Sequence, residues 1–309
     1  RYYKSIKPRP GTLYFSDAHI YPHTGVSGSG RLVNQGVTEY QLTSLAVTNG
    51  SLFAFPVGTA VTITDNLTVS GNSAIELDNG ALTVGGDARF SSGPLTGYSF
   101  ESVLNLHTGA ILSVGGTLTA GSGVLQVRGE PGDSGLTLSV GNNLQLESGA
   151  SFYIYCGATN ALVTPLTTYL SVRGDMSVAS GAWFYPVSDG VSGGSALMQL
   201  RNLTLEAGGG INAVGTGFTA ETVGIGRGFG GAKRSTDFNR GGGGGHGGKG
   251  GRGYTQEATR GATYGIHEAP VWPGSAGATG VSAGNYGGGG GGLVKIEATG
   301  TVTINGSIL

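Results

Sequence analysis

The chain has 309 residues, only 11% of which are charged, and a net charge of −1; an average soluble domain has about 25% charged residues. This balance excludes recognition of nucleic acid or of an anionic membrane through overall charge. The sequence has no run of about 18 apolar residues, so we expect no membrane insertion, and one cysteine excludes an intrachain disulfide. Ser, Thr, Asn and Gly supply the polarity instead, which is typical of an extracellular β-protein.

The first 45 residues give a mixed signal. Pro8, Pro10 and Pro22 interrupt short apolar pieces, and residues 12–15 (TLYF) predict one strand. We interpret residues 1–45 as a cap that leads into the main fold. The N-terminal sequence RYYKSIKPRP is not a signal peptide, so we expect either a processed chain or part of a longer one.

A repeat that begins near residue 46 indicates the fold class. It consists of nonamers with apolar residues or alanine at positions 7 and 9 and Asn, Asp or Thr at position 6. Five of the six also have apolar residues at positions 1 and 3, whereas the sixth moves one to position 4, Leu200. The nonamers are VTITDNLTV (61–69), LTVGGDARF (82–90), LSVGGTLTA (112–120), LSVGNNLQL (138–146), LSVRGDMSV (170–178) and LMQLRNLTL (197–205).

Short segments with period-2 alternation, separated by Gly, Asn and Asp, predict β-strands. Repeats of about 20–30 residues that hold two or three such strands predict a β-solenoid. We therefore expect an all-β fold in which residues 46–207 form stacked rungs. The position-6 residues, for example Asn66 and Asp87, are expected at corners, where their side chains bond the backbone and form a ladder.

A glycine-rich insertion, residues 208–292, interrupts the repeat and holds 32 of the chain's 63 glycines. Glycine lets backbones approach closely, so we expect this insertion to pack compactly against the solenoid. The alternating pattern resumes at residues 293–309, which predict one more rung. No polar cap follows that rung, so we expect its apolar residues to be covered by a second copy or by a longer chain. These predicted assembly residues are Val302, Ile304, Ile308 and Leu309.

The order of these motifs resembles a known family. GGGGGHGGKGG (241–251), Tyr264-Gly265, Pro273-Gly-Ser and a glycine run before LVKIEATGTVTINGSI (293–308) look like the glycine-rich β-helix segment of very large secreted and surface proteins. The resemblance covers roughly residues 200–309. It implies a right-handed parallel β-helix, a secreted or cell-surface location, and a structural or adhesive role.

The insertion also supplies the candidate ligand-binding residues. His246, Lys249 and Arg252 are spaced three apart and predict a basic rim for a carboxylate or a sulfated sugar; alternatively, His246 packs on an aromatic ring and the two cations are solvated. Tyr264, Trp272 and Tyr286 either stack on sugar rings or fill the space that the glycines leave. Long glycine runs can also pack as extended polyglycine helices.

Other chemistry has weaker support in the sequence. Carboxylates that lie near one another are few, and Asp87 and Asp175 already occupy the corner position, so we expect no enzyme; a polysaccharide lyase or hydrolase is the weaker alternative. We expect no metal and no cofactor. Cys156 is predicted to be a buried apolar residue. Four Asn-x-Ser/Thr triplets are glycosylation candidates if the source is eukaryotic: Asn49, Asn66, Asn202 and Asn305.

The leading hypothesis is therefore an extracellular structural protein that builds a fibre, sheath or stalk through end-to-end stacking of solenoids. The alternative is an adhesin or a phage tail-tip module in which the glycine-rich insertion binds carbohydrate.

Overall fold

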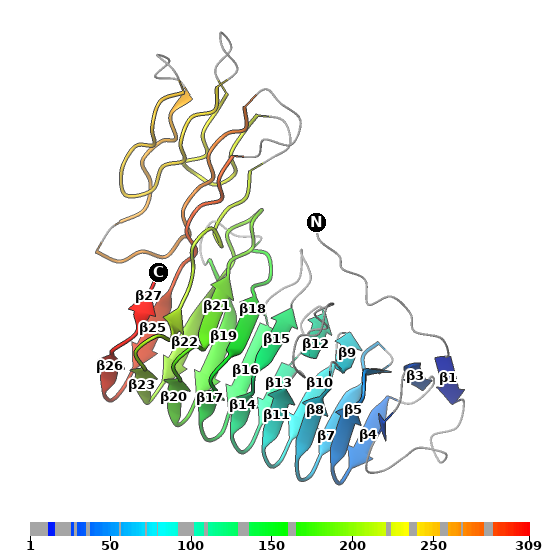
Figure 1. The fold of residues 1–309 in the computed structure, drawn as a ribbon. Coiled ribbons are helices and arrows are strands. Elements are labelled where there is room, and N and C mark those ends of the chain that lie inside the picture. Colours follow the sequence, from blue (N-terminus) through cyan, green and yellow to red (C-terminus); the bar gives the residue numbers. More distant parts are fainter. Residues whose placement is uncertain are drawn as a thin grey trace.

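The computed structural model of the chain is all-β (Figure 1). Within the residues it describes, no helix is long and apolar enough to cross a membrane. The described residues are 12–15, 26–27, 30–34, 38–55, 57–71, 73–78, 80–91, 102–107, 111–128, 136–159, 165–220, 224–234, 240–253, 259–266, 268–280 and 287–309.

The strands form three sheets, and every strand pair between neighbours is parallel. Sheet A contains β1 (Thr12–Phe15), β3 (Gly30–Asn34), β6 (Ser51–Ala54), β9 (Ala74–Asp78), β12 (Ser102–His107), β15 (Gly123–Arg128), β18 (Ala150–Tyr155), β21 (Trp183–Val187), β24 (Gly210–Ile211) and β27 (Ser307–Ile308). Sheet B contains β2 (Val26–Ser27), β5 (Leu45–Thr48), β8 (Leu67–Ser70), β11 (Ala88–Ser91), β14 (Leu118–Ala120), β17 (Leu144–Leu146), β20 (Asp175–Val178), β23 (Asn202–Leu205) and β26 (Val302–Ile304). Sheet C contains β4 (Glu39–Leu42), β7 (Ala60–Ile63), β10 (Ala81–Val84), β13 (Ile111–Val114), β16 (Leu136–Val140), β19 (Leu166–Val172), β22 (Ser195–Leu200) and β25 (Lys295–Ala298).

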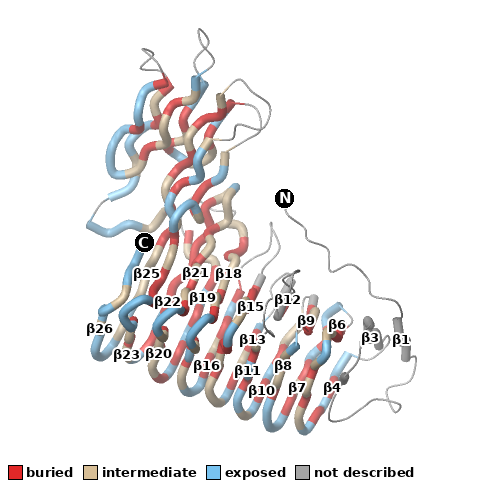
Figure 2. Tube along the Cα trace, in the orientation of Figure 1, coloured by how far each residue is buried: buried red, intermediate tan, exposed pale blue. Residues whose placement is uncertain are grey.

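From β4 onward the chain visits sheets C, B and A in turn, so three successive strands make one rung of a solenoid-like parallel β structure. Each nonamer covers the end of a sheet C strand, a corner, and the start of a sheet B strand. In the second nonamer the residues at positions 1, 3, 7 and 9 are Leu82, Val84, Ala88 and Phe90, and all are at most 1% exposed. Figure 2 shows the same buried and exposed alternation along the stacked strands. The predicted inward positions are thus confirmed.

The predicted corner ladder is confirmed as well. The Asn66 Oδ1 atom accepts a hydrogen bond from the Asp87 backbone N–H at 2.8 Å, and the Asp87 Oδ1 atom accepts one from the Thr117 N–H at 2.7 Å. Asn143 does the same for the Asp175 N–H at 2.9 Å. Each side chain thereby satisfies a backbone donor of the next rung at a corner, where the sheet hydrogen bonds are interrupted.

Two predicted boundaries need correction. Strand β4 pairs with β7 and buries Leu42, so residues 39–45 belong to the solenoid and the boundary at residue 46 is too late. Strand β24 pairs with β21, so the rungs extend to Ile211 and not to residue 207. The signal for β24 was weak because this strand has only two residues, whereas β4 has four, the same length as β7. The N-terminal segment also contributes β1, as predicted from TLYF, together with β2 and β3.

The irregular sixth nonamer has a simple explanation. One residue, Arg201, separates β22 from β23, whereas Arg173 and Gly174 separate β19 from β20 one rung earlier. The shorter corner shifts the inward residues by one position, so Met198 and Leu200 point into the core with exposures of 0% and 4%.

Candidate functional site

The glycine-rich insertion leaves the solenoid between β24 and β25 and extends to one side of the last rungs (Figure 1). Its described residues form extended segments that belong to none of the three sheets; we call them together the glycine bundle. The segments are 213–219, 224–234, 240–253, 259–266, 272–280 and 287–292.

Segment 272–280 lies between several of the others. Three successive N–H groups donate to three different segments: Ala276 to the Arg227 carbonyl at 3.0 Å, Gly277 to Gly288 at 2.9 Å, and Ala278 to Gly242 at 2.9 Å. A β-strand donates its hydrogen bonds to only two sides. Segment 272–280 therefore has hydrogen-bonded neighbours on more than two sides, so the glycine bundle is not a β-sheet.

The hydrogen bonds between segments recur every third residue. Gly274 and Gly277 donate to Gly291 and Gly288, and Gly242 and Gly245 donate to Lys233 and Gly230. A repeat of three residues per turn is the period of the polyproline II helix, which has no internal hydrogen bonds and leaves every amide free for a neighbour. The hydrogen bonding of the glycine bundle has the period of polyglycine helices, a packing that is open to long glycine runs.

This packing leaves no room for side chains at many glycines. A Cβ atom on Gly250 would lie 1.9 Å from the Gly243 carbonyl oxygen, and 2.6 Å from its carbonyl carbon. Backbone atoms of a neighbouring segment cannot move aside as a flexible side chain would. Close approach of backbones therefore explains the glycine content of the insertion.

An aromatic cluster lies within the glycine bundle. The Phe229 ring packs edge-to-face on Trp272 at 4.6 Å between centroids and contacts Tyr264 at 5.7 Å. The His246 ring packs on Tyr264 at 4.8 Å, and its Nε2 atom lies 3.2 Å from the Trp272 carbonyl oxygen. The Tyr264 hydroxyl donates to the Pro273 carbonyl, and burial raises the pKa of Tyr264.

The structure thus separates the residues predicted to bind ligand. Tyr264, Trp272 and His246 are half-buried and pack on one another, which is the space-filling alternative. Lys249 and Arg252 are exposed. Tyr286 lies outside the described residues. The Phe229 ring was missed by sequence reasoning, although a glycine directly follows it, as one follows Tyr264 and Tyr286.

The last rung exposes the predicted assembly residues. Val302 and Ile304 are 49% and 50% exposed, and Ile308 and Leu309 are 44% and 55% exposed.

The glycosylation candidates differ from one another. Asn49 and Asn305 are exposed, and Asn66 and Asn202 belong to the corner ladder, where the Asn202 Oδ1 atom accepts from the Thr301 N–H at 2.7 Å.

The carboxylates at the corner positions already accept hydrogen bonds from neighbouring residues of the fold. Asp175 accepts hydrogen bonds from Arg201 and Asn202, both at 2.8 Å, and its pKa is lowered mainly by the bond from Arg201. Among the described residues, no group of three His, Cys, Asp or Glu side chains is placed to hold a metal ion.

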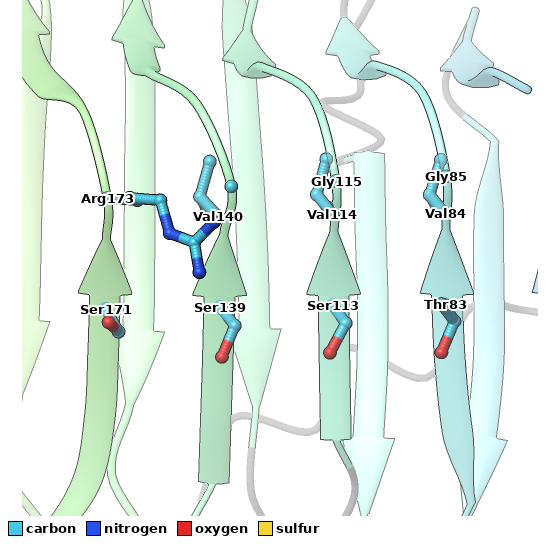
Figure 3. Close-up of a pocket in the computed structure, with 11 residues that line it drawn as sticks. Thr83, Val84, Gly85, Ser113, Val114, Gly115, Ser139, Val140, Ser171 and Arg173 are labelled. Carbon is cyan, nitrogen blue, oxygen red and sulfur yellow. The ribbon is translucent and has the colours of Figure 1, made fainter.

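A shallow groove of about 430 Å³ runs along sheet C where its strands reach the corner (Figure 3). Its lining repeats from rung to rung: a hydroxyl residue, an inward valine, then glycine, with Arg173 in the glycine position of the last rung. The repeat contained the signal for this groove, because position 2 is Ser or Thr in five of the six nonamers. The prediction considered the apolar positions and missed it.

Cys156 is buried, as predicted, and burial raises the pKa of its thiol from 9.0 to about 12. The thiol therefore stays protonated in the folded protein, and it destabilises the fold only when the pH rises above 9 toward 12. We expect a water-soluble thiol reagent at pH 8 to label Cys156 only after denaturation in urea. Mass spectrometry measures the labelling, and rapid labelling of the native protein would contradict the buried position.

Comparison with protein-family models, with curated proteins and with solved structures gave no match. Function is therefore inferred from the geometry of this chain alone.

Proposed function

We propose that the protein is an extracellular structural element: a right-handed parallel β-helix that is lengthened end to end by further rungs and displays the glycine bundle on its side. The handedness follows the strong general preference for right-handed connections between parallel strands. The low content of charged residues, 11%, and the hydroxyl-rich composition support an extracellular location.

The observation that carries this proposal is the continuous parallel stacking of the rungs in three sheets, as far as the last described rung. Val302 and Ile304 pair with Leu203 and Leu205 of the preceding rung, which are 1% and 0% exposed. The same inward positions thus change from fully buried to half exposed within one rung. Apolar side chains in a solenoid are buried when another rung is stacked on them.

The described sheets have matching polarity at their two ends. Sheets A, B and C end in β1, β2 and β4 on one side and in β27, β26 and β25 on the other. Because all pairing is parallel, the end of one copy can continue the sheets of the next in the same direction. Such a head-to-tail contact does not close on itself and therefore produces a filament.

Electron microscopy of the protein at micromolar concentration tests the proposal. We expect filaments whose axial repeat equals the length of one solenoid. Val302→Lys combined with Ile304→Lys should abolish them, because the two lysines would place charge on the stacking surface. Thr303→Lys, on the same strand but the opposite face, is the control and should still form filaments. Discrete rods from the unmodified protein, confirmed by sedimentation, would overturn self-assembly.

A second candidate function is carbohydrate binding by the glycine bundle. The observation that favours it is a charge contrast: residues 208–292 hold seven Lys and Arg against four Asp and Glu, whereas the rest of the chain holds ten against 14. Binding to a glycan array that is lost in both Trp272→Ala and Tyr264→Ala, with normal folding, would support this alternative.

A further inference from the structure

The groove on sheet C contains a regular row of hydroxyl groups. Thr83, Ser113, Ser139 and Ser171 occupy the same position on four neighbouring strands, β10, β13, β16 and β19. Figure 3 shows their side chains in one row. Neighbouring strands are about 4.8 Å apart, so the row extends over about 14 Å. None of the four hydroxyls has a hydrogen-bond partner among the residues that the structure describes.

A guanidinium group without a counter-ion stands at one end of this row. Arg173 lines the groove and reaches across toward Val140 and Ser139 (Figure 3). Two other arginines on the solenoid surface are paired: Arg89 binds Glu147 through two bonds of 2.7 and 2.6 Å, and Arg201 binds Asp175 at 2.8 Å. The Arg173 side chain has no such partner in the described part of the chain. It can therefore bind a carboxylate or sulfate that comes from outside.

An exposed aromatic ring completes the surface. Tyr169 lies two residues before Ser171 on β19, so it points to the same outer face of sheet C, and it is 44% exposed. Ile111, two rungs earlier in the same column, is 46% exposed. An aromatic ring with a free face supplies the apolar contact that a sugar ring uses for stacking.

We propose that this surface binds a linear acidic oligosaccharide that lies along the solenoid axis. One rung is comparable in length with one sugar unit of an extended chain, so successive hydroxyls of the row can bond successive sugar units. Arg173 binds the acidic group, and Tyr169 stacks on a neighbouring ring. The groove lies on the side of the solenoid, so this binding does not depend on end-to-end stacking.

Isothermal titration calorimetry with three hexasaccharides tests the proposal: galacturonate, sulfated galactan and neutral galactan. We expect binding of at least one acidic chain to be about tenfold weaker in Arg173→Gln, which is the loss of one charge-assisted hydrogen bond. Comparison of the affinities of the two acidic chains shows whether the site prefers a carboxylate or a sulfate. The neutral chain should bind weakly, and its affinity should be the same for Arg173→Gln as for the unmodified protein. Tyr169→Ala should weaken binding of the acidic chain as well.

Arg89→Gln is the matched control, since it removes the same charge from sheet B, outside the groove, and should leave binding unchanged. Circular dichroism establishes that each variant is folded. The proposal is overturned if no acidic chain binds the unmodified protein, or if folded Arg173→Gln binds as tightly as the unmodified protein. Loss of binding in Lys249→Gln but not in Arg173→Gln would also overturn it and place the site on the glycine bundle.

Discussion

Replacing Gly290 by alanine is expected to unfold the glycine bundle while the three sheets stay folded. A Cβ atom at this position would lie 1.8 Å from the Gly274 carbonyl oxygen and 2.2 Å from its carbon. Overpacking costs typically about 1–3 kcal/mol when side chains can adjust. Here the obstruction is backbone, so we expect at least about 3 kcal/mol. Hydrogen–deuterium exchange should show loss of protection in segments 213–219 and 272–280.

Gly291→Ala is the control for this experiment. Gly291 is the next residue of the same six-glycine run, and a Cβ atom there would meet nothing within 4 Å. We expect its exchange protection to match that of the unmodified protein. Equal effects of the two substitutions, whether both harmful or both harmless, would show that contacts between backbones do not decide which positions must be glycine.

Replacing Phe184 by alanine is expected to destabilise the solenoid by about 3–5 kcal/mol, as for other fully buried phenylalanines. Phe184 is 0% exposed, pairs in register with Phe152 of the preceding rung, and packs edge-to-face on it at 5.4 Å. Removal of the ring leaves a cavity inside a stack that is fixed by sheet hydrogen bonds on both sides, so the core cannot collapse to fill it. Urea denaturation followed by circular dichroism measures the change.

The same substitution at Phe229 provides the comparison. Phe229 is 45% exposed and belongs to the aromatic cluster of the glycine bundle. Phe229→Ala should leave the urea transition of the sheets within about 0.5 kcal/mol of its original value. If Phe184→Ala had an equally small effect, the stacked rings of Phe152 and Phe184 would not contribute substantially to the stability of the solenoid.

The solenoid and the glycine bundle satisfy the backbone in two different ways. In the solenoid, strands bond only within their sheet, and apolar side chains such as Phe90 and Leu82 fill the interior. In the glycine bundle, hydrogen bonds leave each segment in several directions, and buried residues such as Ala276 and Ala278 are small. The first arrangement depends on side-chain burial and the second on close contact between backbones.

The local pattern was sufficient to predict the strands, their inward residues and the corner ladder. In a strand, alternate residues face opposite sides, so apolar residues at positions 1, 3, 7 and 9 of a nonamer specify one buried face. The ladder through Asn66 and Asp87 follows from the same repeat, because stacked rungs bring equivalent corners together. The boundary at residue 207 was wrong because β24, with two residues, is too short to show a period.

The candidate sites depended on the tertiary structure. Neither the neighbours of segment 272–280 nor the choice of Tyr264 as the ring that packs on His246 can be read from sequence, because a glycine run does not encode which backbone lies beside it. Likewise, Thr83, Ser113 and Ser139 are far apart in sequence and form one row with Ser171 only when parallel strands stack in register. The sequence by itself thus determined the all-β repeat, through the period of its side chains. The tertiary structure decided which repeated residues meet, since this depends on contacts between distant parts of the chain.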